Sequence, residues 1–372
     1  MPREPGSPRM TREGTKAPVI HFVLLIACAA VIYLACTWFV NAVEWLGQRL
    51  RVGPLAVGTI LAAFGTALPE SVVTFVAVVF GAGASQKDVG VGAAMGGPLV
   101  LATIAYGVTG AVMLTRRRRA QVAAPAMVPV GGPVGDAPSV PPAAAPGDDT
   151  GDQGKLARDQ RWFLAIFAVK VALGLVAFAV KPWLGLLFFA AYAVWFWREI
   201  RGGGGHAPSE DLRPLLAQRR RARPTTWAVV TQTVATLAVI FAASQLFVRQ
   251  LDAIGPMLGL PAAVTALLLS PIATELPEIM NAVIWVRQGK TRLALANISG
   301  AMMIQATVPS GLGLLFTPWR FDTALLISGL ATMAAITYLL ILLRTRRFTA
   351  TTVSLAALFY LAFAACLIPI LA

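Results

Sequence analysis

The 372-residue chain has few charged residues: only 13% are Asp, Glu, Lys or Arg, whereas 57% are hydrophobic. A soluble globular protein carries about 25% charged residues. Several apolar runs exceed 18 residues, the length needed to cross roughly 30 Å of hydrocarbon. The composition excludes a soluble protein and predicts a polytopic membrane protein.

Cysteine and histidine are also scarce, with three and two copies. Cys28, Cys36 and Cys366 lie in apolar stretches without CxxC spacing, and His21 and His206 are isolated. This pattern argues against a thiolate or imidazole metal site and against a disulfide framework. There is also no Ser/His pair and no HExxH motif, so we predict neither an enzyme nor a bound cofactor.

The net charge of +14 invites a nucleic-acid interpretation. Lys and Arg also accumulate in the cytoplasmic loops of membrane proteins, where they contact anionic headgroups. We prefer the second explanation, and we expect the lipid bilayer and inorganic cations as partners, with no nucleic acid. The sequence does not indicate an oligomeric state.

A short string occurs twice in the chain. Gly65–Glu70 reads Gly-Thr-Ala-Leu-Pro-Glu, and Ala273–Glu278 reads Ala-Thr-Glu-Leu-Pro-Glu. Each copy places a helix-breaking proline and an acid inside an apolar segment, where both are unusual. Two such copies in one chain favour an ion pathway. A shift of 208 positions superimposes Thr66 on Thr274, Leu68 on Leu276, Pro69 on Pro277 and Glu70 on Glu278.

The apolar runs predict ten membrane-spanning helices in an all-α fold. Five plus five spans give two repeats, at 18–198 and 226–372, with an N-terminal tail at 1–17 and a cytoplasmic linker at 199–225. The first repeat contains an Ala/Pro/Gly-rich loop, 120–154, which we expect to be disordered. The expected spans are 18–46, 54–81, 88–114, 162–180, 183–198, 226–248, 258–287, 292–317, 321–343 and 349–371.

The distribution of Lys and Arg predicts the orientation in the cell membrane. The side that holds the N-terminus carries eight of them and the opposite side carries 22. The positive-inside rule makes the richer side cytoplasmic and both termini extracytoplasmic, although the basic N-terminal tail favours the reverse. The two strings fall in spans two and seven, which cross the membrane in opposite directions. This is the inverted-repeat pattern of secondary transporters, whose sites lie near the midplane at interrupted helices.

Pro69 and Pro277 are expected to break their helices and to free backbone carbonyl groups. With the carboxylates and the Thr66 and Thr274 hydroxyls, these carbonyls provide the oxygen ligands that Ca²⁺ and Na⁺ prefer. The simpler alternative is a proline kink with an acid capping a helix end. Its occurrence twice, in inverted halves, favours a cation site.

The two strings resemble the Gly-Thr-Ser-Leu-Pro-Glu signature of the cation/Ca²⁺ exchanger superfamily. The resemblance covers both halves and implies a sodium/calcium exchanger-like fold of ten helices in two inverted repeats. It also implies that Glu70, Thr66, Glu278 and Thr274 bind the transported ions, with Glu70 and Glu278 as the metal ligands.

The second motif of that family is only half retained. Asn297 and Gln305 offer amide oxygens in the second half, and Glu275 adds an acid there. In the first half, Gly92–Pro98 keeps glycines without polar ligands, and Ala67 stands where the family has Ser. The two halves of the site are therefore expected to be unequal.

We predict an antiporter that exchanges Ca²⁺, or a similar hard cation, for Na⁺ by alternating access. A Ca²⁺/H⁺ antiporter is the alternative, and a non-transporting sensor or scaffold is the alternative from another class. Family analogy adds that spans one and six slide across a core of spans two, three, seven and eight. Lys170 within span four is either a counter-ion or, as we prefer, a lysine that reaches the membrane surface, and Glu44 is expected to be interfacial.

Overall fold

The structure is a computed structural model that describes residues 16–80, 84–123, 150–202, 212–221, 223–259 and 268–371, and all regular elements in these residues are helical. The first repeat contains α1 (Lys16–Leu50), α2 (Pro54–Ala56), η1 (Val57–Ala62), α3 (Ala63–Phe75), η2 (Val76–Phe80), α4 (Ala84–Val100), η3 (Leu101–Ala105), α5 (Tyr106–Ala123), α6 (Thr150–Leu175), η4 (Lys181–Leu184) and α7 (Gly185–Gly202). The linker contains η5 (Leu216–Gln218), and the second repeat contains α8 (Thr226–Met257), α10 (Ser270–Thr274), α11 (Leu276–Arg287), α12 (Thr291–Phe316), α13 (Thr323–Arg344), α14 (Ala350–Ser354) and α15 (Ala357–Leu371).

The helices confirm the predicted all-α membrane fold. Among the described residues, six helices are long and apolar enough to cross a membrane. The expected count of ten spans stays a prediction, because span 258–287 lies partly outside the described residues and the helices at the expected spans 54–81, 162–180 and 183–198 are not among these six. Helix α5 and helix α6 extend into both edges of the loop expected at 120–154, and 124–149 lies outside the described residues.

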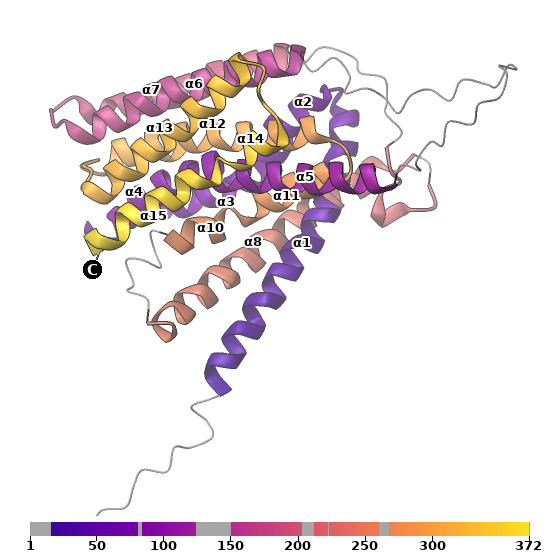
Figure 1. Cartoon of the computed structure of the whole chain (residues 1–372), viewed down its shortest axis with the longest axis horizontal. Helices are drawn as coiled ribbons and strands as arrows, with labels where there is room; N and C mark the ends of the chain where they lie inside the picture. The colour runs from indigo at the N-terminus through magenta and orange to yellow at the C-terminus, as the bar shows by residue number, and fades with distance from the viewer. Residues whose placement is uncertain are drawn as a thin grey trace, which may run out of the picture.

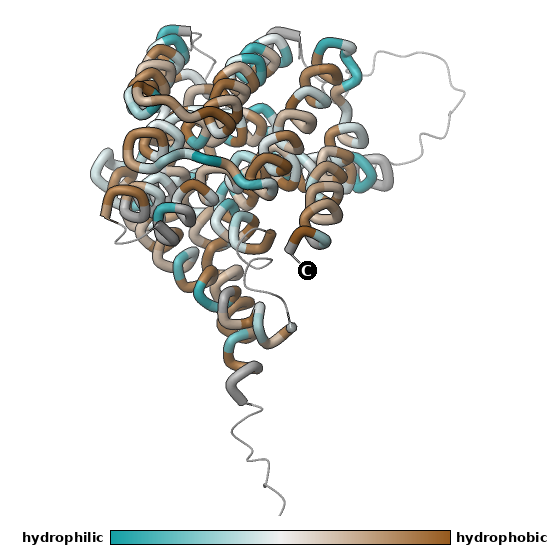
Figure 2. The backbone as a smooth tube through the Cα atoms, turned by 90° about the vertical axis from the view of Figure 1, so that its left-hand side faces the viewer, coloured by the Kyte–Doolittle hydropathy of each residue, from teal (hydrophilic) through white to brown (hydrophobic). Residues whose placement is uncertain are grey.

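Two long helices form a pair at one side of the molecule. Helices α1 and α8 pack against each other along their length, and Figures 1 and 2 show them tapering away from the other helices. Both carry large exposed hydrophobic side chains, such as Ile26 and Leu34 on α1 and Val234 on α8, as expected for helices that contact lipid. We call α1 and α8 the gate pair.

Helix α12 lies at the centre of the remaining helices, the core. It packs against α3, α4, α6, α7 and α11. In its most apolar 18-residue stretch, 83% of the residues are buried. Glycines allow the close approach: a Cβ built at Gly58 of η1 would lie 2.9 Å from the Ala296 Cβ, and one at Gly300 of α12 would lie 2.1 Å from the Thr59 carbonyl oxygen. The backbones of η1 and α12 therefore touch across the two repeats.

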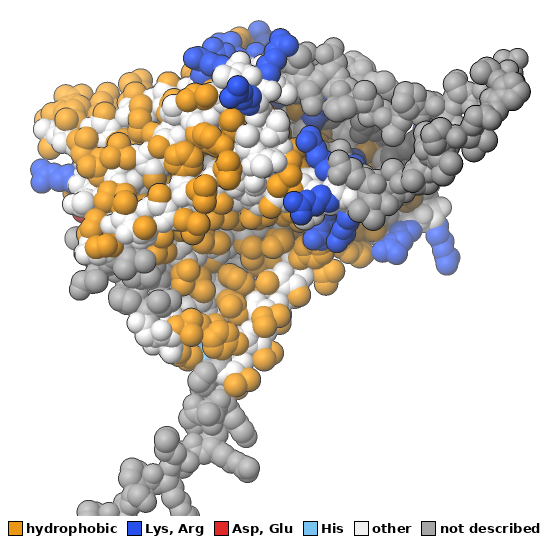
Figure 3. Space-filling model, viewed as in Figure 1, with side chains coloured by type: hydrophobic (Ala, Val, Ile, Leu, Met, Phe, Trp, Pro, Cys, Tyr) orange, Lys and Arg blue, Asp and Glu red, His pale blue; other side chains and the backbone are white. Residues whose placement is uncertain are grey.

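The surface separates by charge. Figure 3 shows a broad hydrophobic surface over the helices, with most of the Lys and Arg side chains gathered along its upper and right-hand edges. We call this end the basic face. The orientation count assigns to the cytoplasm, among others, Arg116–Arg119, Arg198, Arg201, Lys290, Arg344, Arg346 and Arg347.

Gly300→Ala tests the contact between the repeats. The added methyl group would collide with the Thr59 backbone, whereas a Cβ at Gly92, the residue 208 positions earlier, would meet nothing within 4 Å. We expect Gly300→Ala to lower stability by about 1–3 kcal/mol and Gly92→Ala to leave it nearly unchanged. Thermal unfolding in detergent, followed by size-exclusion chromatography, measures both. Equal unfolding temperatures would contradict the contact.

Candidate cation site

The second copy of the repeated string sits at an interrupted helix. Helix α10 ends at Thr274, helix α11 begins at Leu276, and Glu275 between them has φ −84° and ψ 3°, outside helical geometry. Pro277 stands in the first turn of α11, where a missing backbone N–H costs least. The helix is therefore interrupted at Glu275, two residues before Pro277. Glu275 lies at the interruption itself, and Glu278 lies in the first turn of α11.

The first copy differs. Helix α3 runs from Ala63 to Phe75 through Pro69, so the expected break at that residue is absent. A single proline removes one hydrogen bond, which a helix can absorb by bending. The irregular turns are instead the π-helical η1 and η2 at either end, a feature often found at functional sites. The side chains of Pro69 and Glu70 lie outside the described part of the structure.

The polar side chains of α11 and α12 are buried together. Glu275 and Glu278 are each 1% exposed, and Asn297 and Gln305 are equally inaccessible. The amide nitrogen of Gln305 donates to the Oε1 of Glu275 at 2.6 Å, and that of Asn297 donates to the backbone carbonyl of Glu278 at 3.4 Å. Four of the residues expected at the site are thus brought together in two pairs.

Beside these pairings, several buried amide oxygen atoms have no hydrogen-bond donor in the described part of the structure. Within the described residues, the Asn297 Oδ1 and the Gln305 Oε1 are buried and accept no hydrogen bond, and neither does the Oδ1 of Asn281 one turn after Glu278. A buried polar atom without a partner costs about 1–3 kcal/mol. A hard cation would satisfy such amide oxygens together with the two carboxylates.

Both threonines of the repeated string use their protons locally. The Thr66 hydroxyl donates to the Ala62 carbonyl at 3.1 Å, and the Thr274 hydroxyl donates to the Pro271 carbonyl at 3.1 Å. A hydroxyl bonded in this way keeps its lone pairs for a cation. In the part of the chain that the structure describes, no three His, Cys, Asp or Glu residues cluster as a metal site, so a cation here would rely on amide and hydroxyl oxygens as well.

Gly97 of the first repeat closes the site from the opposite side. A Cβ built there would lie 2.5 Å from the Gln305 Oε1 and 2.8 Å from the Glu275 Oε1. The shift of 208 positions places Gly97 on Gln305, so the first repeat has a glycine where the second has an amide. The sequence analysis noted only that this stretch keeps glycines without polar ligands, and it did not indicate that Gly97 borders the polar pair.

Lys170 does not reach the membrane surface, contrary to our preferred interpretation. It is completely buried, and its Nζ donates to the Ala94 carbonyl of α4 at 2.6 Å. In a regular helix that carbonyl would accept from the backbone N–H of Pro98, which proline lacks. The lysine therefore fills a hydrogen bond that the proline removes, one turn from Gly97.

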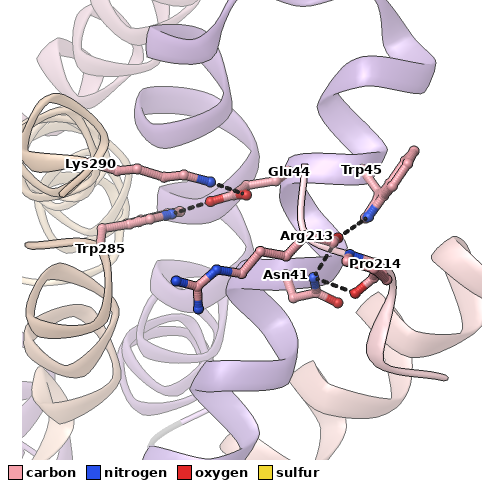
Figure 4. A network of polar contacts seen from close by, with 7 residues as sticks. All are labelled: Asn41, Glu44, Trp45, Arg213, Pro214, Trp285 and Lys290. Carbon is pink, nitrogen blue, oxygen red and sulfur yellow. Dashed lines mark hydrogen bonds and ion pairs between the residues drawn. The ribbon is translucent and has the colours of Figure 1, made fainter. Parts of the chain in front are cut away.

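Glu44 is buried in an ion pair. Its two oxygens accept from the Trp285 indole at 2.9 Å and from the Lys290 ammonium at 2.5 Å, which ties α1 to the end of α11 (Figure 4). Nearer the interruption, the Cys36 thiol of α1 lies 3.8 Å from the Pro277 carbonyl. No sequence motif pointed to these contacts, because they join segments about 240 residues apart.

Buried carboxylates and amides at an interrupted helix, inside an all-helical membrane fold, are typical of membrane transporters. The chain belongs to the sodium/calcium exchanger protein family, whose model matches residues 20–200 and 228–369. The superfamily expected from the two repeated strings is confirmed, and the protein is a transporter, not an enzyme.

Individual relatives agree with this family. A stretch of 146 residues, 38% of the chain, is 32% identical to a protein named as an antiporter, CaxA, of Alkalimonas amylolytica, and spans 45% of that relative. Structures of the sodium-calcium exchanger NCX_Mj have the same fold. One soaked with Na⁺ and Sr²⁺ gives a TM-score of 0.67 at 14% identity, over 94% of this chain and 99% of that one. Another, soaked with Na⁺ and Ca²⁺, gives 0.66 at 15% identity, over 94% and 98%.

The link between Lys170 and Pro98 predicts energetic coupling between them. Lys170→Met removes the donor to the Ala94 carbonyl, and Pro98→Ala restores a backbone N–H that can replace it. Lys170 should therefore contribute about 1–3 kcal/mol more stability in the wild type than in the Pro98→Ala background. Unfolding of the two single variants and the double variant in detergent measures this coupling. Strictly additive effects would show that the lysine does not replace the missing donor.

Proposed function

We propose that the protein is a secondary antiporter of the cell membrane that exchanges Ca²⁺, or a similar hard cation, for Na⁺ by alternating access. The observation that carries the proposal is the buried set of oxygen atoms on α11 and α12. Glu275 and Glu278 supply negative charge there, and Asn297 and Gln305 supply amide oxygens that no described residue satisfies. Oxygen ligands of this kind suit hard cations and not Zn²⁺ or Cu²⁺.

The first repeat completes the site in the proposal. Helix α3, which carries Thr66 and Glu70, packs against both α11 and α12. The cation would therefore bind between the repeats, with Thr274 contributing from the second copy. Because Gly97 replaces an amide ligand, the first repeat contributes fewer oxygens than the second.

The gate pair is built to move as one unit with the linker. The Asn41 amide of α1 donates to the backbone carbonyls of Arg213 and Pro214 (Figure 4). Its oxygen accepts from the Leu216 N–H. The Gln232 amide of α8 accepts from the Ala217 N–H and donates to the α1 backbone. The linker therefore clamps α1 to α8, which supports a sliding motion of the pair across the core.

Proton coupling is the second candidate. Two carboxylates in one buried site disfavour simultaneous ionisation unless a cation is bound, so a proton can take the place of Na⁺. The glycine at position 97 supports this candidate, since glycine supplies no side-chain oxygen to a cation. A non-transporting scaffold has less support, because a scaffold gains nothing from burying Glu275 and Glu278.

The orientation follows the positive-inside rule. The basic face is assigned to the cytoplasm, and both termini are assigned to the outside.

Flux measurements with Glu70→Gln and Glu278→Gln test the proposal. Proteoliposomes loaded with Ca²⁺ are placed in a Na⁺ gradient or, separately, in a pH gradient. We expect Na⁺-driven efflux from the wild type and about 10- to 100-fold less from either variant, since each loses a charge-assisted contact to the cation. Asp322→Asn is the matched control, because Asp322 is exposed, caps α13 and can be replaced by another capping residue.

Each other outcome has a definite meaning. Efflux driven only by the pH gradient would select the proton-coupled alternative. Efflux driven by neither gradient would overturn the antiporter. Efflux that survives both substitutions would reject the site while leaving transport intact.

A further inference from the structure

A second buried polar cluster lies at the basic face, away from the cation site. Lys155 and Asp159 are one turn apart on α6, and Trp195 and Glu199 are one turn apart on the facing α7. Lys155 forms an ion pair with Glu199, and the Trp195 indole donates to Asp159 at 3.4 Å. Both acids are buried, with exposures of 4% for Asp159 and 5% for Glu199.

The charges in this cluster do not balance. Two buried carboxylates share one close ammonium, and that ammonium pairs with Glu199. Asp159 is left with a single long hydrogen bond from an uncharged indole among the described residues. The other charged or titratable groups that face Asp159 are Arg158 on its own helix and Tyr106 of α5. When both acids are ionised, the cluster therefore carries one negative charge that the close ammonium does not balance.

Burial and the negative charge of Glu199 together raise the pKa of Asp159 to about 6, although Lys155, the Trp195 hydrogen bond and Arg158 oppose the shift. Asp159 precedes the expected span at 162–180. It is therefore protonated below about pH 6 and ionised above it. The change in charge falls close to the pH range of a cell interior.

The cluster contacts η1, the segment that leads directly into α3 with the first repeated string. The Thr59 hydroxyl of η1 donates to the Glu199 Oε1 at 2.6 Å. On the other side of η1, the Thr59 backbone touches Gly300, and a Cβ at Gly58 would lie 3.2 Å from the backbone nitrogen of Asn297. One turn of η1 thus separates the acids from the α12 segment whose Asn297 binds the Glu278 carbonyl.

We propose that Asp159 and Glu199 form a proton-binding site at the basic face, and that its protonation controls how well cations enter the exchange site from that face. The control role rests on the proposed exchange; the proton site does not. With Asp159 ionised, the cluster carries an additional negative charge beside η1, which attracts cations toward the site. A bound proton removes that attraction.

Infrared titration of the purified full-length protein tests the proton site without transport. A protonated carboxylic acid has a carbonyl band that its carboxylate lacks. We expect such a band with a midpoint near pH 6 that disappears in Asp159→Asn. Glu199→Gln should lower the midpoint, because it removes a neighbouring negative charge, and Lys155→Met should raise it. A spectrum unchanged by Asp159→Asn would overturn the proposal.

Exchange measured against the pH of the basic face tests the control role. For the wild type, the apparent affinity for Ca²⁺ at that face should fall about three- to tenfold between roughly pH 7.5 and 5.5, the order expected for one charge acting through protein and water. Asp159→Asn should show the weaker affinity throughout and lack this component. Asp322→Asn should behave as the wild type.

The two measurements separate the possible failures. If the infrared band titrates but the Ca²⁺ affinity of Asp159→Asn still falls with pH as in the wild type, the control role is overturned. A titrating band in a protein without any Ca²⁺ exchange would support the proton site and overturn the proposed exchange.

Discussion

An oxygen atom buried inside a membrane protein needs a hydrogen-bond donor or a cation, because no water is present to satisfy it. The second repeat gathers such oxygens around Glu275 at the interruption, Glu278 on α11, and Asn297 and Gln305 on α12. The same constraint explains Lys170, which supplies the donor that Pro98 withholds from the Ala94 carbonyl. A lysine thus satisfies the buried carbonyl oxygen of the scaffold, and we propose that a cation satisfies the buried oxygens of the site.

Close packing between the repeats depends on glycines, and it makes the two halves unequal. Gly58 and Gly300 bring η1 against α12, and Gly97 lets α4 approach Glu275 and Gln305. At the position that matches Gln305, the first repeat has Gly97, which lacks a side chain. The side chains of Gln305 and Glu275 occupy the space beside it. The two repeats therefore differ in chemistry, with the described polar side chains concentrated at the start of α11 and on α12.

The sequence predicted the helical membrane fold and the family, because long apolar runs and a breaker beside an acid are local signals. It did not predict that α3 continues through Pro69 while the second copy is interrupted at Glu275. It also did not predict the partners of Lys170 and Glu44, which lie on helices distant in sequence. Partner choice depends on tertiary packing, which a local pattern does not encode.

Crystals of the protein grown with and without a divalent cation that scatters anomalously test the central claim most directly. The account predicts one anomalous peak within coordination distance of Glu278, with amide oxygens of α12 among the other ligands, and predicts its loss in Glu278→Gln. A peak elsewhere, or no peak at saturating cation in a protein that transports it, would contradict the account.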